Sequence, residues 1–369
     1  MLREHWPQVL SHNNINSWQI RVLGALKKCR TADLGGHIDA CTDCGVVRIS
    51  YNSCRNRHCP KCQGIKREEW IAARENELLP VPYFHVVFTL PDLLNPLAIH
   101  QPKELYDTLF DAAWQTLKKF GMDPKHLGAQ TGMIAILHTW GQTLSLHPHL
   151  HCIVPGGGLT ERGKWKMAKS DGKYLFPVKS LSKALRGKFM HSLKAKNLTS
   201  DKQLINALYK KEWVIYAKQP FGNPHCVIEY LGRYTHKIAI SNHRIKSITP
   251  DLITFSYKDY KHGDVKKEMS LSPVEFIRRF SMHIMPKGFV RIRHFGILSS
   301  TGKKKAIPLI KEQFPKEEAL PAEPRILETY NPKRCPHCKT ETMINLEILP
   351  KRGPPSHAAL METVRMEKK

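Results

Sequence analysis

The order of apolar and polar residues predicts short strands and amphipathic helices along most of the 369-residue chain. Apolar runs at 84–90, 133–140 and 149–154 are short and are followed by proline or glycine, which is typical of strands. Between the first two runs, residues 103–120 carry apolar positions at helical spacing. This part of the chain therefore has a strand, helix, strand, strand order.

The same criteria predict further elements and divide the chain into four regions. The elements are a helix over 63–79, a strand over 213–216, a helix after Pro224 that carries residues 227–234, hairpin strands over 237–245 and 252–257, a helix over 272–284 and a strand over 288–295. The regions are a cysteine-rich domain over 1–79, a domain over 80–245 with a basic insertion at about 160–206, an α/β extension over 246–314, and a partly disordered tail over 315–369.

Charge favours nucleic acid as the partner. The 58 Lys and Arg against 32 Asp and Glu leave a formal charge of +26, spread along the chain, and a polyanion would offset this self-repulsion. A solvated basic surface is the alternative. No apolar run approaches the roughly 20 residues that span a bilayer, and the first residues lack the apolar stretch of a signal peptide. We therefore expect no membrane partner and a cytoplasmic, nucleoid-associated protein.

Two CxxC pairs predict a structural zinc site. Cys41 and Cys44 are followed, after 14 intervening residues, by Cys59 and Cys62. Four thiolates at such spacing can surround one zinc ion tetrahedrally and leave no position open for water. In a chain without an export signal, clustered cysteines indicate metal binding and not disulfides.

Other residues near these pairs allow a second zinc site, so one or two ions are expected. The candidate ligands are Cys29, His37, Cys54 and His58. Alternatively, the histidines contact phosphate and Cys29 is simply buried. In the tail, Cys335 and Cys338 make only half a site unless another residue completes it. Arg55 and Arg57 lie among the cysteines and are expected to bind DNA.

The segment His147-Pro148-His149-Leu150-His151 predicts a second kind of metal site. On a strand, His149 and His151 point to the same face, where two imidazoles can hold one cation. An antiparallel pairing with the preceding strand would set His138 opposite His151 or Gln142 opposite His149, and either would supply a third ligand. Bound Mg²⁺ or Mn²⁺ would keep open positions for a scissile phosphate. His147 is a bystander or a phosphate contact, and the alternative for the pair is a solvated strand face.

Tyr230 and Tyr234 lie four residues apart on the predicted helix, so both phenols project from one face. A phosphotyrosine link to DNA conserves bond energy, so a 3′ hydroxyl can later reverse the attack without ATP. The alternative is a pair of tyrosines that packs against the sheet. Basic residues near the tyrosines and on the strand over 288–295 are expected to meet phosphate groups: Arg233, Lys237, Arg244, Arg291 and Arg293.

These motifs, in this order, resemble the IS91-like transposases, which belong to the His-hydrophobic-His single-strand endonucleases. The residues that carry the resemblance are 51–62, His138-Thr139-Trp140, 147–151, 230–240, 276–280 and 291–296. The resemblance covers most of the chain and is weakest after about residue 315.

The resemblance implies an α+β fold: a zinc-binding N-terminal domain and a catalytic domain with an antiparallel sheet flanked by helices, of ferredoxin- or RRM-like kind. It also implies an enzyme that nicks single-stranded DNA at the element's end, links to the 5′ phosphate and transfers one strand by rolling-circle replication. His149 and His151 take the metal-ligand role, Tyr230 and Tyr234 that of the nucleophile, and a homo-oligomer is compatible. The alternatives are a replication initiator or relaxase, and a zinc-dependent DNA-binding regulator without catalysis.

Overall fold

The computed structural model describes residue 2 and residues 4–11, 15–75, 77–169, 174–218, 232, 238–315 and 331–351. The chain divides into two compact units. Unit 1 combines Met1–Lys66 with Pro324–Lys369, and unit 2 comprises Arg67–Glu323. Unit 1 is therefore built from both ends of the chain.

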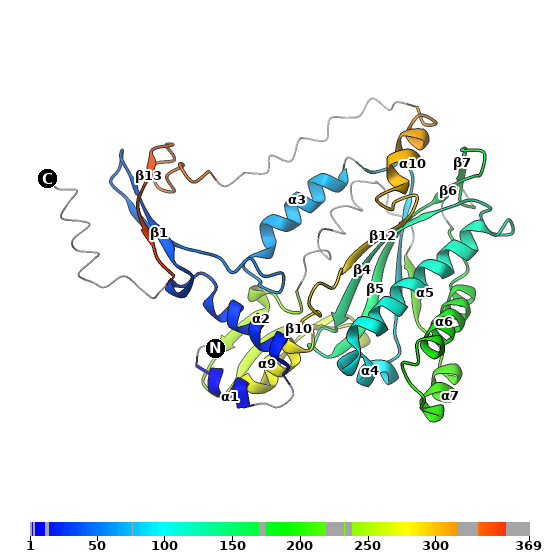
Figure 1. The fold of residues 1–369 in the computed structure, drawn as a ribbon, viewed down its shortest axis with the longest axis horizontal. Coiled ribbons are helices and arrows are strands. Elements are labelled where there is room, and N and C mark those ends of the chain that lie inside the picture. The colour runs from blue at the N-terminus through cyan, green and yellow to red at the C-terminus, as the bar shows by residue number, and fades with distance from the viewer. Residues whose placement is uncertain are drawn as a thin grey trace. The chain divides into compact units, whose positions relative to one another are not determined.

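A five-stranded antiparallel sheet forms the centre of unit 2 (Figure 1). Its strands are β3 (Tyr83–Thr89), β4 (Gly132–Trp140), β5 (Leu146–Pro155), β8 (Ile215–Lys218) and β12 (Ile292–Gly296), in the order β12-β4-β5-β3-β8. The central strands β4 and β5 are buried along most of their length, which explains their nearly continuous apolar sequence.

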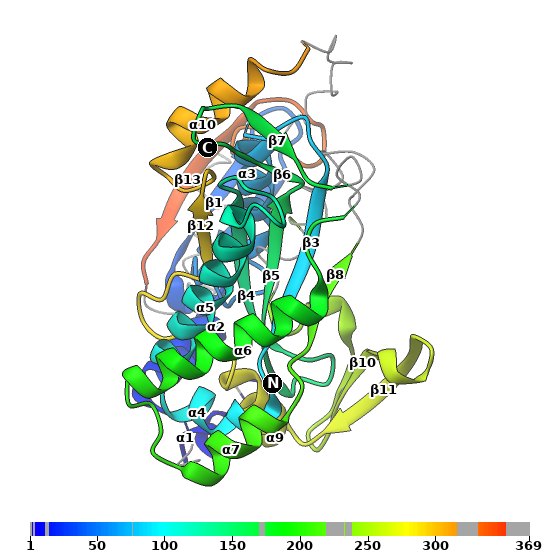
Figure 2. The ribbon, with the colours of Figure 1, turned by 90° about the vertical axis from the view of Figure 1, so that its right-hand side faces the viewer.

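Helices α5 (Pro102–Met122) and α6 (Val178–Ala195) pack over one face of this sheet (Figure 2). Because side chains alternate along a strand, Phe84, Val86 and Phe88 of β3 all point to this face. Helix α6 buries five apolar side chains in the same core: Leu181, Leu185, Phe189, Met190 and Leu193. One side of α6, within the predicted basic insertion at 160–206, thus completes the main core.

The opposite face of the sheet carries a second, smaller core. Ile71 of α3 (Gln63–Glu75) and Ile310 of α10 (Gly302–Lys311) belong to this cluster with Ile134, Ile136 and Ile153 of the sheet. The same strand face continues beyond these isoleucines into the histidines of β4 and β5.

The remaining elements of unit 2 surround this sheet. They are η2 (Asp92–Leu94), α4 (Asn95–His100), β6 (Gly157–Leu159), β7 (Trp165–Met167), α7 (Lys202–Lys210), η3 (Asn242–Arg244), β9 (Ile245–Ile248), β10 (Ile253–Asp259), η4 (Tyr260–His262), β11 (Val265–Leu271) and α9 (Pro273–Ser281). Strands β11-β10-β9 form a three-stranded sheet, and β6 and β7 form a hairpin. Ser272 caps α9 by accepting a hydrogen bond from the backbone N–H of Glu275.

Unit 1 contains helices α1 (Trp6–Ser11) and α2 (Ser17–Lys28), the short η1 (Ala32–Leu34), and a sheet in the order β13-β1-β2. Asn16 begins α2 with a capping box in which its side chain and that of Gln19 bond each other's backbone N–H groups. Strand β13 (Met343–Leu349) pairs antiparallel with β1 (Gly36–Cys41), and β2 (Val47–Tyr51) lies on the other side of β1.

The structure confirms the predicted α+β class, with antiparallel sheets flanked by helices. Within the predicted tail, residues 331–351 form a knuckle and a strand in unit 1. The strand expected over 237–245 is not observed at residues 238–244, which are the part of that range described before β9. These residues form no strand pairing and lead into η3. The helix expected after Pro224 lies outside the described residues. No helix within the described part of the chain has the length and apolar character to cross a membrane.

Candidate metal centres

Three histidines converge on one face of the central sheet. The β4–β5 register sets His138 directly opposite His149, and His151 is the next residue on the same face of β5. Ring nitrogens of all three lie within 4.8 Å of one another. The Nε2 atoms of His149 and His151 are 3.1 Å apart. Two ligands at right angles around a cation with bonds of about 2.1 Å would be about 3.0 Å apart, so this spacing fits a shared ion.

Two further contacts fix the orientation of these rings. The Nδ1–H of His149 donates to the carbonyl of His147 at 2.6 Å, which leaves the lone pair on Nε2. Nδ1 of His151 hydrogen-bonds Nε2 of His85 at 2.9 Å, and the two rings are stacked with their centroids 5.1 Å apart. Partners of this kind outside a metal site orient the ligands and select the nitrogen that faces the ion.

Burial differs among the three histidines in a way that suits an accessible site. His138 and His151 are buried, whereas His149 is half-buried at the outer end of the group. Trp140 stacks on His138 with their centroids 4.5 Å apart and closes one side of the group. The sheet thus supports the imidazoles from one side, and His149 is the most exposed of the three.

His85 did not emerge from the sequence as a site residue. It lies in an apolar run of β3, where a histidine resembles a core position. In the structure, His85 and Val87 share a strand face, and β3 pairs with β5 at Val87 and His151. Only the register reveals that neighbour.

Three side chains hold the turn that leads into the histidine strand. Successive carbonyls of the turn accept from them: Gln142 from Arg244, Thr143 from Arg279 at 3.1 Å, and Leu144 from His283 at 3.1 Å. Burial lowers the pKa of His283 to about 4, so at neutral pH its ring is uncharged and its Nε2–H donates. Leu144 has a φ of 60°, an uncommon backbone conformation for a leucine that this set of bonds supports.

The other predicted residues of this site have different outcomes. The observed pairing of His138 with His149 differs from both expected registers, because β4 and β5 are joined by a turn over 141–145, closed by the Gly141 N–H bond to the Ser145 carbonyl, that fixes which residues oppose each other. Gln142 lies in the turn beyond the strands, and its amide donates to the hydroxyl of Tyr260 at 3.2 Å. Tyr230 and Tyr234, with Arg233 and Lys237, lie outside the described residues.

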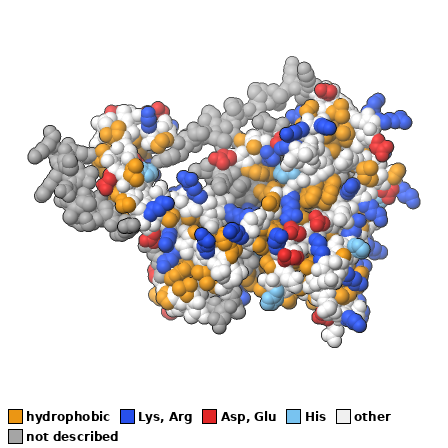
Figure 3. All heavy atoms as spheres, in the orientation of Figure 1, with side chains coloured by type: hydrophobic (Ala, Val, Ile, Leu, Met, Phe, Trp, Pro, Cys, Tyr) orange, Lys and Arg blue, Asp and Glu red, His pale blue; other side chains and the backbone are white. Residues whose placement is uncertain are grey.

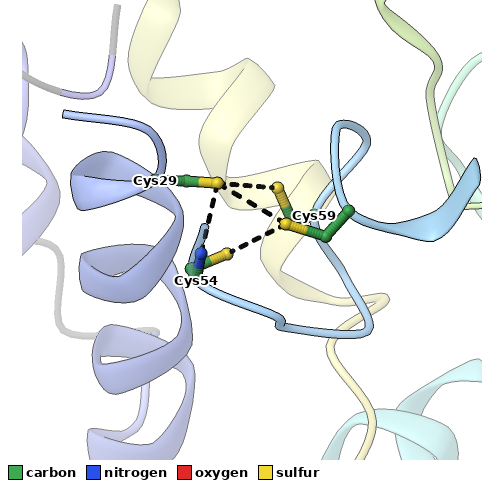
Figure 4. A group of neighbouring side chains, drawn as sticks. Cys29, Cys54 and Cys59 are labelled. Atoms are coloured by element: carbon green, nitrogen blue, oxygen red, sulfur yellow. Dashed lines mark hydrogen bonds between the residues drawn. The ribbon is translucent and has the colours of Figure 1, made fainter. Parts of the chain in front are cut away.

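Unit 1 holds a group of four cysteine sulfurs at the end of α2. Cys29 lies 3.5 Å from Cys59 and 3.6 Å from Cys62, and Cys54 lies 3.8 Å from Cys62, all between Sγ atoms. Zn–S bonds of about 2.3 Å require tetrahedron edges of about 3.8 Å, so the four sulfurs match a zinc site. Figure 4 shows the labelled sulfurs of Cys29, Cys54 and Cys59 pointing toward one another.

This grouping corrects the predicted ligand set of Cys41, Cys44, Cys59 and Cys62. Cys41 ends β1 at the turn of the β1–β2 hairpin, whereas Cys54 follows β2 at the hairpin's other end, where Gly36 pairs with Tyr51. Six residues of strand separate these ends by roughly 17 Å, too far for one ion. The prediction treated spacing in sequence as spacing in space and missed the intervening hairpin.

A second group of four sulfurs lies at the hairpin turn. Cys41 is 3.5 Å from Cys338, and Cys44 is 3.6 Å from Cys335. The tail therefore supplies the other half of what was expected to be an incomplete site. His37 and His58, proposed as ligands of a second zinc, belong to neither group of sulfurs. His37 instead lies 3.1 Å from the carboxylate of Asp39.

Comparison with known proteins identifies the family. A model described as "Transposase zinc-binding domain" matches residues 1–90, and one described as "Putative transposase" matches residues 132–305. The chain is 30% identical, over 83% of its length and 77% of the relative's, to the transposase for insertion sequence element IS801 of Pseudomonas savastanoi pv. phaseolicola. The chain belongs to the IS91-like transposase family.

A second relative extends this match. The transposase is 41% identical, over 93% of both chains, to "Putative transposase y4qJ" of Sinorhizobium fredii. No solved structure matches the chain significantly. The resemblance inferred from the motifs is thus confirmed, and the Cys29, Cys54, Cys59 and Cys62 site falls within the matched zinc-binding domain.

A transposase acts on DNA, and Lys and Arg side chains are spread over the visible face of the molecule (Figure 3). Arg293, predicted to contact DNA, is instead paired with Asp107 and lies 4.2 Å from the ring centre of Phe110, so much of its charge is already engaged. Arg57 is half-buried, and burial lowers its pKa. Arg55 is exposed, and Arg291 is half-buried just before β12. Of these four, Arg55 is the most available to a phosphate.

Proposed function

We propose that the transposase nicks and rejoins single-stranded DNA through Tyr230 and Tyr234, at a Mg²⁺ or Mn²⁺ site made by His138, His149 and His151, to drive rolling-circle transposition. The observation that carries the proposal is the convergence of the three imidazoles, two of them with Nε2 atoms 3.1 Å apart. Three protein ligands leave further positions of an octahedral ion open, as a catalytic site requires.

The donor set bears on the choice of ion. Imidazole nitrogens are softer ligands than the oxygens that Mg²⁺ prefers, and Mg²⁺ gives up its water reluctantly. Mn²⁺ binds a given set of ligands more weakly than the other divalent ions of the first transition row. Three imidazoles would therefore hold it exchangeably. We therefore expect activity with both ions and a lower required concentration of Mn²⁺.

The protein's own groups would perform the following chemistry. The phenol oxygen of one tyrosine attacks the phosphorus as its proton leaves, a bond forms between tyrosine and the 5′ phosphate, and the bond to the 3′ oxygen breaks. That oxygen takes up a proton and departs as a 3′ hydroxyl. A divalent cation on the histidines would polarise the phosphate and stabilise the leaving oxygen. A second tyrosine allows a second linkage before the first is resolved.

The path of the chain supports a nucleophile from this segment. The last residue of β8, Lys218, pairs with His85, which itself bonds His151. Tyr230 follows Lys218 by twelve residues in the sequence. After the segment, Ile238, Ala239 and Ile240 are buried again.

The test uses the full chain and an end-labelled single strand carrying the element's terminus, with Mn²⁺. An SDS-resistant adduct should form with wild type and with Tyr209→Phe, a control whose tyrosine is exposed on α7. It should be absent with the double variant Tyr230→Phe, Tyr234→Phe. An adduct that persists in the double variant would refute the nucleophile assignment. A wild-type protein that binds the strand without any adduct would instead indicate a non-catalytic zinc-dependent regulator.

A further inference from the structure

The second group of sulfurs, Cys41, Cys44, Cys335 and Cys338, consists of two matched knuckles. In each, the N–H of the fourth residue after the first cysteine donates to that cysteine's carbonyl: Gly45 to Cys41 and Lys339 to Cys335, both at 3.0 Å. Both donors have a left-handed backbone, with φ of 71° and 66°. For lysine this conformation is costly, and a tight turn that aims two sulfurs at one point explains it.

The two knuckles face each other in a crossed arrangement. The first sulfur of each lies close to the second of the other, at 3.5 Å for Cys41 and Cys338 and 3.6 Å for Cys44 and Cys335. All four sulfurs lie within 4.8 Å of one another. These separations are near the edge of about 3.8 Å expected around zinc and far from the S–S bond of about 2.05 Å in a disulfide.

Hydrogen-bond donors surround these sulfurs. The hydroxyl of Thr342 lies 3.2 Å from Cys41 Sγ, that of Thr340 lies 2.9 Å from Cys338 Sγ, and the N–H of His337 donates to Cys335 Sγ at 3.4 Å. Donors of this kind stabilise thiolates, the form in which cysteine binds metal, and orient them.

Among the described residues, the apolar cluster around this group is small. It contains Cys41, Cys335 and Met343, with Cys338 packed against it. Otherwise residues 331–351 are joined to unit 1 mainly through the pairing of β13 with β1. A short strand on a three-stranded sheet with so small a core needs a further stabilising interaction, and a bound metal ion commonly supplies one.

We propose that Cys41, Cys44, Cys335 and Cys338 bind a zinc ion that fastens the C-terminal segment to unit 1. The two CxxC pairs lie 291 residues apart in sequence, from Cys44 to Cys335. Two of them lie outside the region matched by the zinc-binding family model. The zinc-binding unit of this transposase would then hold two zinc ions and require both ends of the chain.

Thiol labelling of the wild-type full-length protein tests the site without any variant. Cys44 is exposed, so as a free thiol it would react quickly with N-ethylmaleimide. We expect Cys44 and Cys338 to be protected in the zinc-loaded protein, and all four cysteines to become reactive together after chelation, as mapped by peptide mass spectrometry. Labelling of Cys44 at the same rate with and without chelator would overturn the proposal. So would labelling that requires a reductant, which would indicate a disulfide.

Metal analysis of variants provides the second arm. The double variant Cys335→Ser, Cys338→Ser should contain one zinc ion fewer per chain than wild type, whereas Cys152→Ala, which removes a buried thiol of unit 2, should lose none. Amide exchange should accelerate in β13 and stay unchanged in β4 and β5. An unchanged zinc content in the double variant, or iron in place of zinc, would contradict the assignment.

Discussion

The two units of this transposase gather metal-binding residues in opposite ways. Unit 1 brings together two sets of four cysteine sulfurs, and each set closes a tetrahedron with protein ligands alone. Unit 2 brings together three imidazoles on one strand face, and in the proposed catalytic site the remaining positions of the ion would go to other ligands. Closed sulfur sites are typical of ions that hold a fold, and open nitrogen sites of ions that act on a substrate.

The parts of the fold that carry the cysteines and the histidines also differ. The sulfurs lie on knuckles and loops, and the apolar cluster described around the second group contains only Cys41, Cys335 and Met343 with Cys338 beside it, so we expect the fold there to depend on the ions. The histidines lie on central strands of a large core that folds from apolar packing, which fixes their geometry before an ion arrives. The comparison predicts that ligand loss unfolds unit 1 but only inactivates unit 2.

The largest effect is expected from a closed site. Cys59→Ser should release zinc from the site of Cys29, Cys54 and Cys62 and unfold that part of unit 1, because a structural zinc contributes on the order of 10 kcal/mol to small domains. Zinc content and amide exchange of β1 would report the loss, while β4 in unit 2 should keep its protection. Retained zinc with a protected β1 would contradict the structural role.

A variant of the open site should separate activity from folding. His151→Ala should lower DNA cleavage by roughly a thousandfold, because loss of a cation that stabilises the leaving oxygen costs several kcal/mol in the transition state. Zinc content and thermal unfolding should change little, as with the control His191→Ala, an exposed residue of α6. If His151→Ala unfolded unit 2 or retained full activity, the contrast between the sites would be lost.

A milder change should act through orientation alone. His85→Phe preserves a flat ring beside His151 but removes the hydrogen bond to its Nδ1, so we expect a roughly 10- to 100-fold loss in metal affinity. Cleavage measured against Mn²⁺ concentration should require more ion and approach the wild-type rate at saturation. A reduced rate at saturating ion, with unchanged affinity, would indicate a different role for His85.

The smallest expected effect concerns pH. Burial lowers the pKa of His283 from 6.5 to about 4, so below pH 6.5 the unfolded chain binds a proton that the folded chain excludes. Above that pH this proton does not reduce the free energy of unfolding. Between pH 7 and pH 5 the free energy of unfolding should fall by about 2 kcal/mol. His283→Gln, whose amide can still donate to Leu144, should flatten the decline seen in chemical denaturation. An equally steep decline in that variant would exclude His283 as its source.

Much of the fold followed from local patterns, and the site followed less completely. Apolar runs with clear ends predicted β3, β4, β5 and α5, because buried strands and amphipathic helices leave direct signals. Helix α6 was missed because its lysines obscured the apolar stripe of Leu185 and Phe189. In the site, alternation on a strand sufficed for His149 and His151, whereas His85 depended on strand register, which no local pattern specifies.

The cysteines illustrate the same limit. Two CxxC pairs indicated zinc correctly, but Cys59 and Cys62 are joined by Cys29 and Cys54, and the partners of Cys41 and Cys44 depend on the return of the chain's C-terminal segment beside β1. A pairing between residues almost 300 positions apart is not encoded in spacing. The one sign in the sequence was that Cys335 and Cys338 make only half a metal site, so that a distant pair of ligands had to complete it.

The central claim is that a tyrosine of unit 2 becomes linked to DNA under control of the histidine site. Trypsin cuts after Lys218, Arg233 and Lys237, so it places Tyr230 and Tyr234 in separate peptides, 219–233 and 234–237. After reaction with a single strand and Mn²⁺, followed by nuclease and trypsin, mass spectrometry should find a nucleotide on one or both peptides in wild type. It should find none in His151→Ala. A nucleotide on any other peptide, or an equal yield in His151→Ala, would contradict the account.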